Sequence, residues 1–159
     1  MSRDRMEPNE SVERAYYTSR YRHGVDEKRR VQIPAKWRPD KSGFELTLVV
    51  WPKSNEGPCL RVLPPKRMAD LMAQIAAMPV GDPNKAILKR FIGSMSVVVT
   101  VDQAGRICVP EELAKIAEIK DEALFVGLLD QFEIWNPDRY ERVQNADAVM
   151  APEAFKLID

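Results

Sequence analysis

The chain contains an internal repeat, and this feature limits the possible folds more than any other in the sequence. Residues 25–34 (VDEKRRVQIP) and 101–110 (VDQAGRICVP) share Val, Asp, Arg and Pro at an offset of 76, with an aliphatic-x-aliphatic pair before the Pro in both. A second match, Leu60–Met68 with Phe132–Tyr140, has an offset of 72. The first copy therefore contains four extra residues, which we place in the loop-like segment Ser54–Pro58.

The repeat divides the chain into five predicted segments. Residues 1–18 are polar and lack periodicity, as expected for a flexible arm. In the joint between the copies, Asp82-Pro83 precedes a helical pattern. The predicted segments are a flexible arm (1–18), a first repeat (19–78), a linker helix (79–94), a second repeat (95–145) and a C-terminal tail (146–159).

Each copy is predicted to contain the same order of elements. A strand enters a tight turn at Asp-x-x-x-Arg, and a second strand leaves it with alternating apolar and polar residues. A proline then begins a helix, where its missing N–H costs little, and two more strands and a longer helix follow. The predicted strands are 21–25, 30–33, 45–51 and 59–63 in the first copy and 95–101, 106–109, 124–128 and 132–135 in the second, and the longer helices are 65–78 and one with Asn136 as its N-cap.

Neither copy has enough apolar surface to form a stable core by itself. Two copies with short hairpins can instead share one core. The helix 65–78 adds an apolar stripe that is predicted to be buried in that core: Met68, Leu71, Met72 and Ile75. The sequence thus predicts an α+β fold, mostly β, in which two tandem repeats form a pseudo-two-fold β-barrel with flanking helices.

Charge is distributed unevenly along a chain whose formal net charge is zero. Residues 20–41 have eight basic and three acidic side chains, a net charge of +5, whereas residues 102–159 have six basic and thirteen acidic ones, a net charge of −7. A basic pole can bind phosphate on one face of a neutral protein. Opposite poles can also serve only solubility or subunit docking, and the charge pattern is compatible with both interpretations.

The two Asp-x-x-x-Arg turns have a structural and a functional interpretation. Asp26 and Asp102 can accept backbone N–H groups within their turns and pair with the following Arg, and Gly105 supplies the positive φ that a tight turn needs. The first turn also has three successive cations, Lys28–Arg30, and Arg is well suited to guanine edges and to phosphate. The two interpretations are compatible, because the Asp can fix the loop while the cations project.

The residues around both turns resemble a known family. His23–Arg38 (HGVDEKRRVQIPAKWR) is similar to the opening of the MraZ family, whose pattern is roughly His-x-Leu-Asp-x-Lys-Gly-Arg-x-x-Ile-Pro-Ala-Lys-Phe-Arg, and Asp102–Leu113 with Gly127–Trp135 resembles its second half. The resemblance covers about residues 19–145. It implies a swapped-hairpin, AbrB-like barrel and a ring-shaped homo-oligomer. It also implies binding to double-stranded DNA at short promoter repeats of the cell-division and cell-wall operon, usually as a repressor, and hence a cytoplasmic, nucleoid-associated protein.

The resemblance also implies which residues face the DNA and which shape the turns. Asp26 and Asp102 would shape the turns, and the DNA-facing residues would be Lys28, Arg29 and Arg30 in the first copy and Gln103 and Arg106 in the second. Arg22 is a further predicted DNA-binding residue, because it belongs to the basic stretch beside the first turn. Two positions depart from the family pattern. Arg29 replaces a glycine, so the first turn is expected to be built differently or to have gained a phosphate contact. Ala104 replaces a lysine, so the second turn is expected to contact DNA more weakly.

Other chemistry has little support in the sequence. The single histidine, His23, and two distant cysteines, Cys59 and Cys108, do not make a metal site, and lone cysteines in an unexported chain are most simply reduced thiols. The sequence has no catalytic constellation, Gly-rich phosphate loop or membrane-length apolar run. We therefore expect no enzyme, catalytic residue, metal, cofactor, small-molecule substrate or membrane partner. The alternative to a DNA-binding regulator is a protein-binding ring or scaffold without DNA binding, which the zero net charge and the altered first turn suggest.

Overall fold

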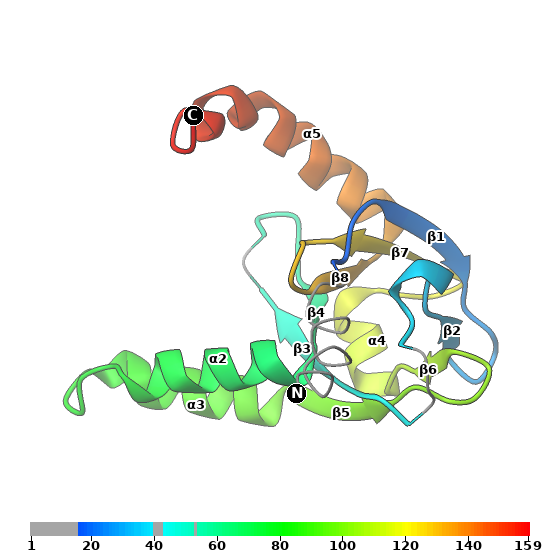
Figure 1. Cartoon of the computed structure of the whole chain (residues 1–159), viewed down its shortest axis with the longest axis horizontal. Coiled ribbons are helices and arrows are strands. Elements are labelled where there is room, and N and C mark those ends of the chain that lie inside the picture. Colours follow the sequence, from blue (N-terminus) through cyan, green and yellow to red (C-terminus); the bar gives the residue numbers. More distant parts are fainter. Residues whose placement is uncertain (1–15, 40–42, 53) are drawn as a thin grey trace, which may run out of the picture.

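The computed structural model describes residues 16–39, 43–52 and 54–159, so most of the predicted arm (1–18) lies outside the described residues. The fold is α+β, and its strands pair antiparallel (Figure 1). The elements are β1 (Arg20–Gly24), β2 (Arg30–Gln32), the 3-10 helix η2 (Ala35–Trp37), β3 (Glu45–Trp51), β4 (Cys59–Leu63), α2 (Pro65–Ala76), α3 (Pro83–Ser94), β5 (Ser96–Thr100), β6 (Arg106–Cys108), α4 (Glu111–Ala117), β7 (Glu122–Gly127), β8 (Phe132–Trp135) and α5 (Pro137–Phe155).

Six strands form one sheet in the order β1-β7-β8-β4-β3-β5. If each strand is replaced by its counterpart in the other copy, the same strand order results, read in the opposite direction. The first strand of each copy, β1 or β5, pairs with a strand of the other copy, β7 or β3, and β4 and β8 meet in the middle. The repeat in the sequence is therefore a repeat in the structure, and its two copies are interleaved.

The register of the strands locates the pseudo-two-fold axis that relates the copies. Arg61 of β4 lies opposite Glu133 of β8, and Val31 of β2 lies opposite Ile107 of β6. These are residues that the repeat itself relates, at the offsets of 72 and 76. The axis therefore passes between the two members of each pair, through the middle of the sheet and through the β2–β6 pairing.

β2 and β6 form a separate two-stranded ribbon. Within the described ranges the six-stranded sheet is open, because β1 and β5 are its edges and do not pair with each other. Where the sequence predicts a β-barrel, no closed barrel is found in the described part of the chain. The physical reason is that β1 and β5 each lead through an Asp turn into the ribbon, so β2 and β6 pair with each other and do not extend the sheet.

The main core lies between the sheet, the ribbon and α4. The ribbon contributes Val31 and Ile107, the sheet contributes Phe125 and Phe132, and α4 contributes Leu113, all of them almost completely buried. Full burial of such a side chain stabilises the fold by about 1.5–3 kcal/mol. Since both copies supply strands to the sheet and to the ribbon that enclose this core, neither copy has a core of its own.

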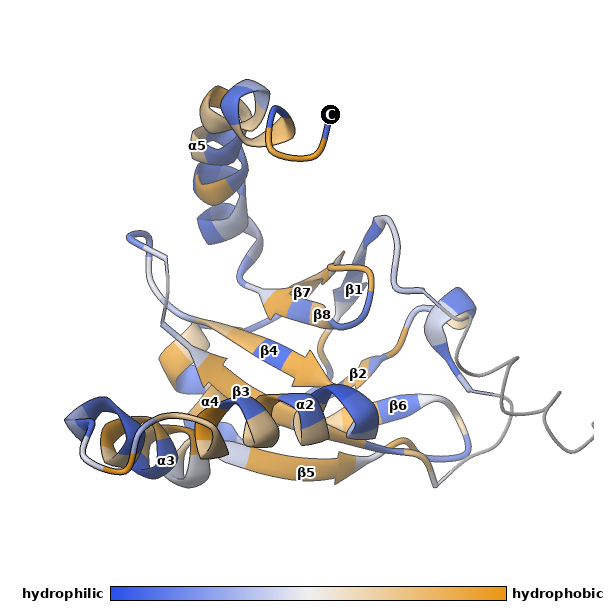
Figure 2. Ribbon diagram, turned by 60° about the vertical axis from the view of Figure 1, so that its left-hand side comes forward, coloured by the Kyte–Doolittle hydropathy of each residue, from blue (hydrophilic) through white to orange (hydrophobic). Residues whose placement is uncertain are grey.

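The α2–α3 hairpin projects from one end of the molecule, and the ribbon lies at the other end (Figures 1 and 2). Leu71 and Ile75 of α2 are buried in a second apolar cluster, and Met68 packs against it, as the stripe predicts. The predicted burial of Met72 is wrong, because this side chain is 60% exposed. α2 packs against α3, β3 and β4, and Met72 lies on the exposed side of the helix.

α5 begins as the sequence predicts. The Asn136 side chain accepts a hydrogen bond from the Arg139 N–H at 2.9 Å, and Pro137 occupies the first turn. The helix continues to Phe155, so most of the segment 146–159 is helical. None of the helices in the described part of the chain has the length and apolar character needed to cross a membrane.

Candidate nucleic-acid interface

Asp26 closes the first turn with three hydrogen bonds. Its Oδ1 accepts the backbone N–H groups of Lys28 (2.9 Å) and Arg30 (2.8 Å), and its Oδ2 accepts the Nε–H of Arg30 (2.8 Å). The N–H of Arg29 donates to the Asp26 carbonyl at 2.9 Å and completes the tight turn. Hydrogen bonds from Arg30, first from its backbone and then from its side chain, hold the pKa of the Asp26 carboxyl below its ordinary value of 3.8.

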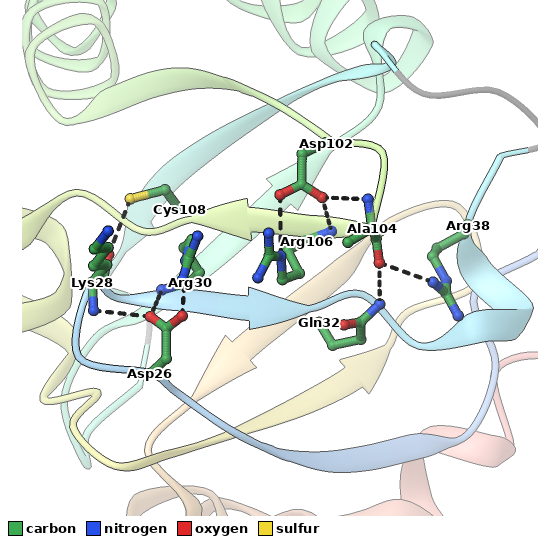
Figure 3. Close-up of polar contacts among 9 residues, drawn as sticks. All are labelled: Asp26, Lys28, Arg30, Gln32, Arg38, Asp102, Ala104, Arg106 and Cys108. Carbon is green, nitrogen blue, oxygen red and sulfur yellow. Dashed lines mark hydrogen bonds and ion pairs between the residues drawn. The ribbon is translucent and has the colours of Figure 1, made fainter.

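Asp102 closes the second turn with the same set of bonds (Figure 3). Its Oδ1 accepts the N–H groups of Ala104 and Arg106, both at 2.9 Å, and its Oδ2 accepts the Nε–H of Arg106 at 3.1 Å. The N–H of Gly105 donates to the Asp102 carbonyl at 2.9 Å. The backbone hydrogen bond from Arg106 is the main reason that the pKa of Asp102 is also lowered. Both carboxylates thus shape their turns and fix the arginine that follows.

Arg29 and Gly105 occupy the same position in their turns, with φ of 60° and 82°. A positive φ costs a residue with a Cβ about 1–2 kcal/mol. Arg29 nevertheless adopts it, with its Nε donating to the Val109 carbonyl (3.0 Å) and its own carbonyl accepting the Val109 N–H (2.9 Å). The expectation of a differently built first turn is therefore wrong, whereas a gained phosphate contact stays a prediction.

The ribbon presents polar residues of both copies on one outer face. In its register Arg30 lies opposite Cys108 and Gln32 lies opposite Arg106, while the intervening residue of each strand is buried. Arg30 and Arg106 are therefore diagonal neighbours, with Cα atoms roughly 7–8 Å apart, and Figure 3 shows them side by side between the two Asp residues. Their side chains are 36% and 34% exposed, so each fixed guanidinium is open to a ligand.

Each turn is braced by the ribbon strand of the other copy. The Gln32 Nε2 donates to the Ala104 carbonyl of the second turn at 2.6 Å. At the equivalent place the Cys108 thiol donates to the Lys28 carbonyl of the first turn at 3.4 Å. Gln32 and Cys108 were not among the site residues predicted from the sequence, although their offset of 76 marks them as equivalent.

Arg38 is a further residue of the interface that sequence reasoning missed. Its Nη1 donates to the Ala104 carbonyl at 3.3 Å, and a Cβ on Gly105 would overlap its Nη1 and Cδ. The second turn therefore has a guanidinium over its positive-φ position, where the first turn has the side chain of Arg29. No local sequence signal indicates this contact, because Arg38 belongs to the other copy.

The structure brings together five of the six predicted DNA-binding residues. Lys28 and Gln103 are exposed within their turns, beside Arg29, Arg30 and Arg106 of the turns and ribbon. Arg22 is separate from them on β1, where its Nη1 donates to the Glu122 carboxylate at 2.9 Å. Its charge is thus partly neutralised at the sheet edge.

The lone histidine packs beside its strand. The His23 ring meets Phe125 edge-on with centroids 5.6 Å apart, and burial, with a smaller effect from the positive charge of Arg38, lowers its pKa. In the residues that the structure describes, His, Cys, Asp and Glu side chains form no group of three that could hold a metal ion.

Together these features define a class of protein: a duplicated α+β chain whose interleaved repeats present two braced turns, the first of them rich in cations, at one two-stranded ribbon. The model of a family described as "MraZ protein, putative antitoxin-like" matches residues 95–155. The chain is 32% identical over 145 residues to the Transcriptional regulator MraZ of Roseiflexus sp. (strain RS-1), with 90% of this chain and 97% of the relative covered.

Two further relatives agree. The Transcriptional regulator MraZ of Ruegeria sp. (strain TM1040) is 34% identical to this chain, with 86% of this chain and 83% of the relative covered. The Transcriptional regulator MraZ of Herpetosiphon aurantiacus is 32% identical, with 86% of this chain and 92% of the relative covered. The chain belongs to the MraZ family, whose relatives carry the name of transcriptional regulators.

Proposed function

We propose that this chain is a transcriptional regulator that binds double-stranded DNA sequence-specifically through its two Asp turns and the outer face of the β2–β6 ribbon. The observation that carries the proposal is the pair Arg30 and Arg106, which lie side by side on that face. Each is held by the same set of hydrogen bonds to the Asp of its turn, Asp26 or Asp102, and we call each set an Asp bracket. The names of the family relatives support the regulatory role.

The geometry of the ribbon suits the major groove of DNA, which admits a two-stranded β-ribbon. Each arginine uses its Nε for the Asp bracket, so the two Nη groups can form a fork with guanine O6 and N7 or with a phosphate. Because the bracket fixes the side chain beforehand, less conformational entropy is lost on binding. Lys28 and Gln103, exposed within the turns, would extend the contact in both directions along the groove.

We further propose that several copies assemble into a ring. Large apolar side chains are exposed on α3 and β5: Ile87, Leu88, Phe91, Val97 and Val98. A ring would present several ribbons to several DNA repeats at once, and the linked binding events would raise the apparent affinity without new contacts.

The finer assignments rest on the family resemblance. They are a swapped-hairpin form of the interleaved repeats 19–78 and 95–145, joined by the linker 79–94. They also include repression of the cell-division and cell-wall operon from short promoter repeats, and a nucleoid-associated location in the cytoplasm.

The test is a mobility shift with the DNA upstream of the chain's own gene and a scrambled duplex of equal length. Arg30→Ala and Arg106→Ala should each weaken the preference for the upstream DNA by about 1–3 kcal/mol, since each removes one guanidinium fork. Arg90→Ala is the matched control, because Arg90 is an exposed arginine on α3. Full binding by the Arg30→Ala/Arg106→Ala variant would refute the assigned surface.

A protein-binding ring or scaffold is the second candidate function. The zero net charge of the chain and the net −7 of residues 102–159 favour it. It would replace the DNA-binding proposal if the wild-type protein showed no affinity for any duplex at low salt.

A further inference from the structure

A groove of about 330 Å³ lies beside the first turn. Its floor is apolar, formed by Ala114 and Ile119, which are only 5% and 6% exposed. Charged side chains form its walls. The lining residues are Arg29, Glu111, Ala114, Lys115, Glu118, Ile119 and Lys120. The lysines are far from the turn in sequence, so no local sequence pattern connects them with it.

Hydrogen bonds fix the groove to the first turn. The Val25 N–H, directly before the turn, donates to the Asp121 carbonyl at 2.8 Å and so holds the α4–β7 loop in place. Two hydrogen bonds between Arg29 and Val109, the latter two residues before α4, hold the start of that helix. The turn, α4 and the loop therefore form one unit, and Arg29 belongs to both the turn and the groove.

The groove is cationic once its ion pairs are considered. Glu118 is paired with the buried Arg139 at 2.7 Å, and Glu111 is paired with Lys115 at 3.4 Å. The first pair neutralises Glu118, and the second lies between exposed side chains and is weak. Arg29 and Lys120 add two positive charges that neither of these carboxylates compensates. A ligand with negatively charged oxygens fits this arrangement.

The second turn is covered differently in the described part of the chain. The space over Gly105 is filled by Arg38, and the segment equivalent to α4 begins with the three-residue η2. Lys115 and Lys120 of the groove lie beside the first turn. This asymmetry fits a contact that lies to one side of the ribbon.

We infer that the groove binds a phosphate of the DNA backbone next to the bases that the ribbon contacts, with Arg29, Lys115 and Lys120 as its ligands. This inference rests on the proposed DNA-binding function. A ribbon in the major groove has a phosphate backbone on each side, so a cationic groove that begins in a turn of the ribbon lies beside one of them. Such a contact adds affinity and orientation but no sequence preference.

The test measures DNA affinity over a series of salt concentrations for Lys120→Ala, Lys115→Ala and the double variant. The slope of log K against log salt should decrease in magnitude by about 0.9 in the double variant, because this variant loses the one phosphate contact of the groove. Affinity should fall equally for the upstream duplex and for the scrambled duplex. Lys120→Arg should keep the wild-type slope. Lys66→Ala/Lys89→Ala removes the same charge from exposed positions on α2 and α3 and should also keep it.

The outcomes separate this inference from the proposed function. If wild-type protein binds DNA and the groove double variant keeps the slope of the Lys66→Ala/Lys89→Ala control, the inference is wrong while the proposed function stands. If wild-type protein binds no duplex, the proposed function fails. A free anion as the true ligand would also overturn the inference. In that case inorganic pyrophosphate would bind the wild type and not the groove double variant, and the two proteins would share one DNA salt slope.

Discussion

At the scale of single residues, the two turns show how one backbone conformation is reached with two different residues. Gly105 adopts positive φ without steric cost, whereas Arg29 adopts it with a Cβ and two hydrogen bonds to Val109. The Asp brackets are the same in both turns, so they, and not the glycine, are the shared determinant of the turn. The second turn favours glycine for a separate reason: Arg38 occupies the space that a Cβ at position 105 would fill.

Gly105→Ala should destabilise the protein by about 1–2 kcal/mol or more, because a Cβ there meets positive φ as well as Arg38. Gly93→Ala is the matched control. Gly93 is helical, and a Cβ there would have open space. It should stabilise the protein by about 0.5–1 kcal/mol. Urea unfolding of both variants measures the difference, and equal effects of the two substitutions would contradict the role of Arg38.

The lowered pKa values of Asp26 and Asp102 predict a specific acid dependence. Because each carboxyl has a lower pKa in the folded chain than its ordinary 3.8, its contribution to stability is complete above that value. It is lost as the pH falls through the folded-state pKa. Asp26→Asn/Asp102→Asn should therefore unfold with a smaller loss of stability between neutral and strongly acidic pH than the wild type. Urea unfolding along a pH series measures this, with Asp159→Asn as a control. If all three proteins lost the same free energy of unfolding on acidification, the stabilising role of the two carboxylates would be contradicted.

At the scale of elements, the contact between β4 and β8 joins the two copies at their pseudo-two-fold axis. Arg61 donates to Glu133 from Nε (3.1 Å) and Nη2 (2.7 Å), and Trp135 Nε1 donates to the same carboxylate at 2.8 Å. Arg61 also lies over the Trp51 ring, 4.1 Å from its centroid. Two identical copies would place like charges at this position, so the divergence of Arg61 from Glu133 favours pairing between unlike copies.

A double-mutant cycle tests this contact. Arg61→Leu leaves a carboxylate whose side chain is only 9% exposed, and this should cost about 3–5 kcal/mol. Glu133→Leu should cost less, because Arg61 keeps 20% exposure and its contact with Trp51. The Arg61→Leu/Glu133→Leu variant should be more stable than Arg61→Leu, since no unpaired charge remains. Additive losses in urea unfolding would contradict the coupling.

The elements also show what could be predicted from the sequence. Alternation and turn residues located β3, β4 and β8 at their observed bounds and β1 to within one residue. The open sheet was not predicted, because a repeat indicates shared strands and not which partners they choose. Arg38 and Lys120 were missed for a related reason: each lies beside a turn that is distant in sequence. Whether Met72 is buried depends on how far α3 covers α2, and the apolar periodicity of the sequence does not show this.

At the scale of the whole molecule, the exposed apolar side chains of α3 and the cationic ribbon lie far apart. The ribbon is at one end of the longest axis, and the α2–α3 hairpin extends to the other (Figure 1). Ile87 and Phe91 of α3 remain 51% and 39% exposed. Contacts between copies through this hairpin would therefore leave every ribbon free for DNA.

Ile87→Glu/Phe91→Glu should lower the molar mass measured by light scattering, because charges would then have to be buried between copies. Unfolding of the separate chain should change little, since both side chains are already partly exposed. Val80→Glu, at a position that is 92% exposed in the loop between α2 and α3, is the control and should keep the wild-type mass. An unchanged mass in the double variant would exclude this face of α3 as the contact.

The interleaved sheet has a consequence for synthesis on the ribosome. β1 pairs with β7, so the strand that contains Arg20 has no partner until Val126 has been synthesised. At about 5–20 residues per second, this separation corresponds to roughly 5–20 s of translation. Pairings between residues so distant in sequence also form slowly. The nascent first copy therefore exposes an unpaired strand and half a core for most of its synthesis, which is when chaperones would be needed most.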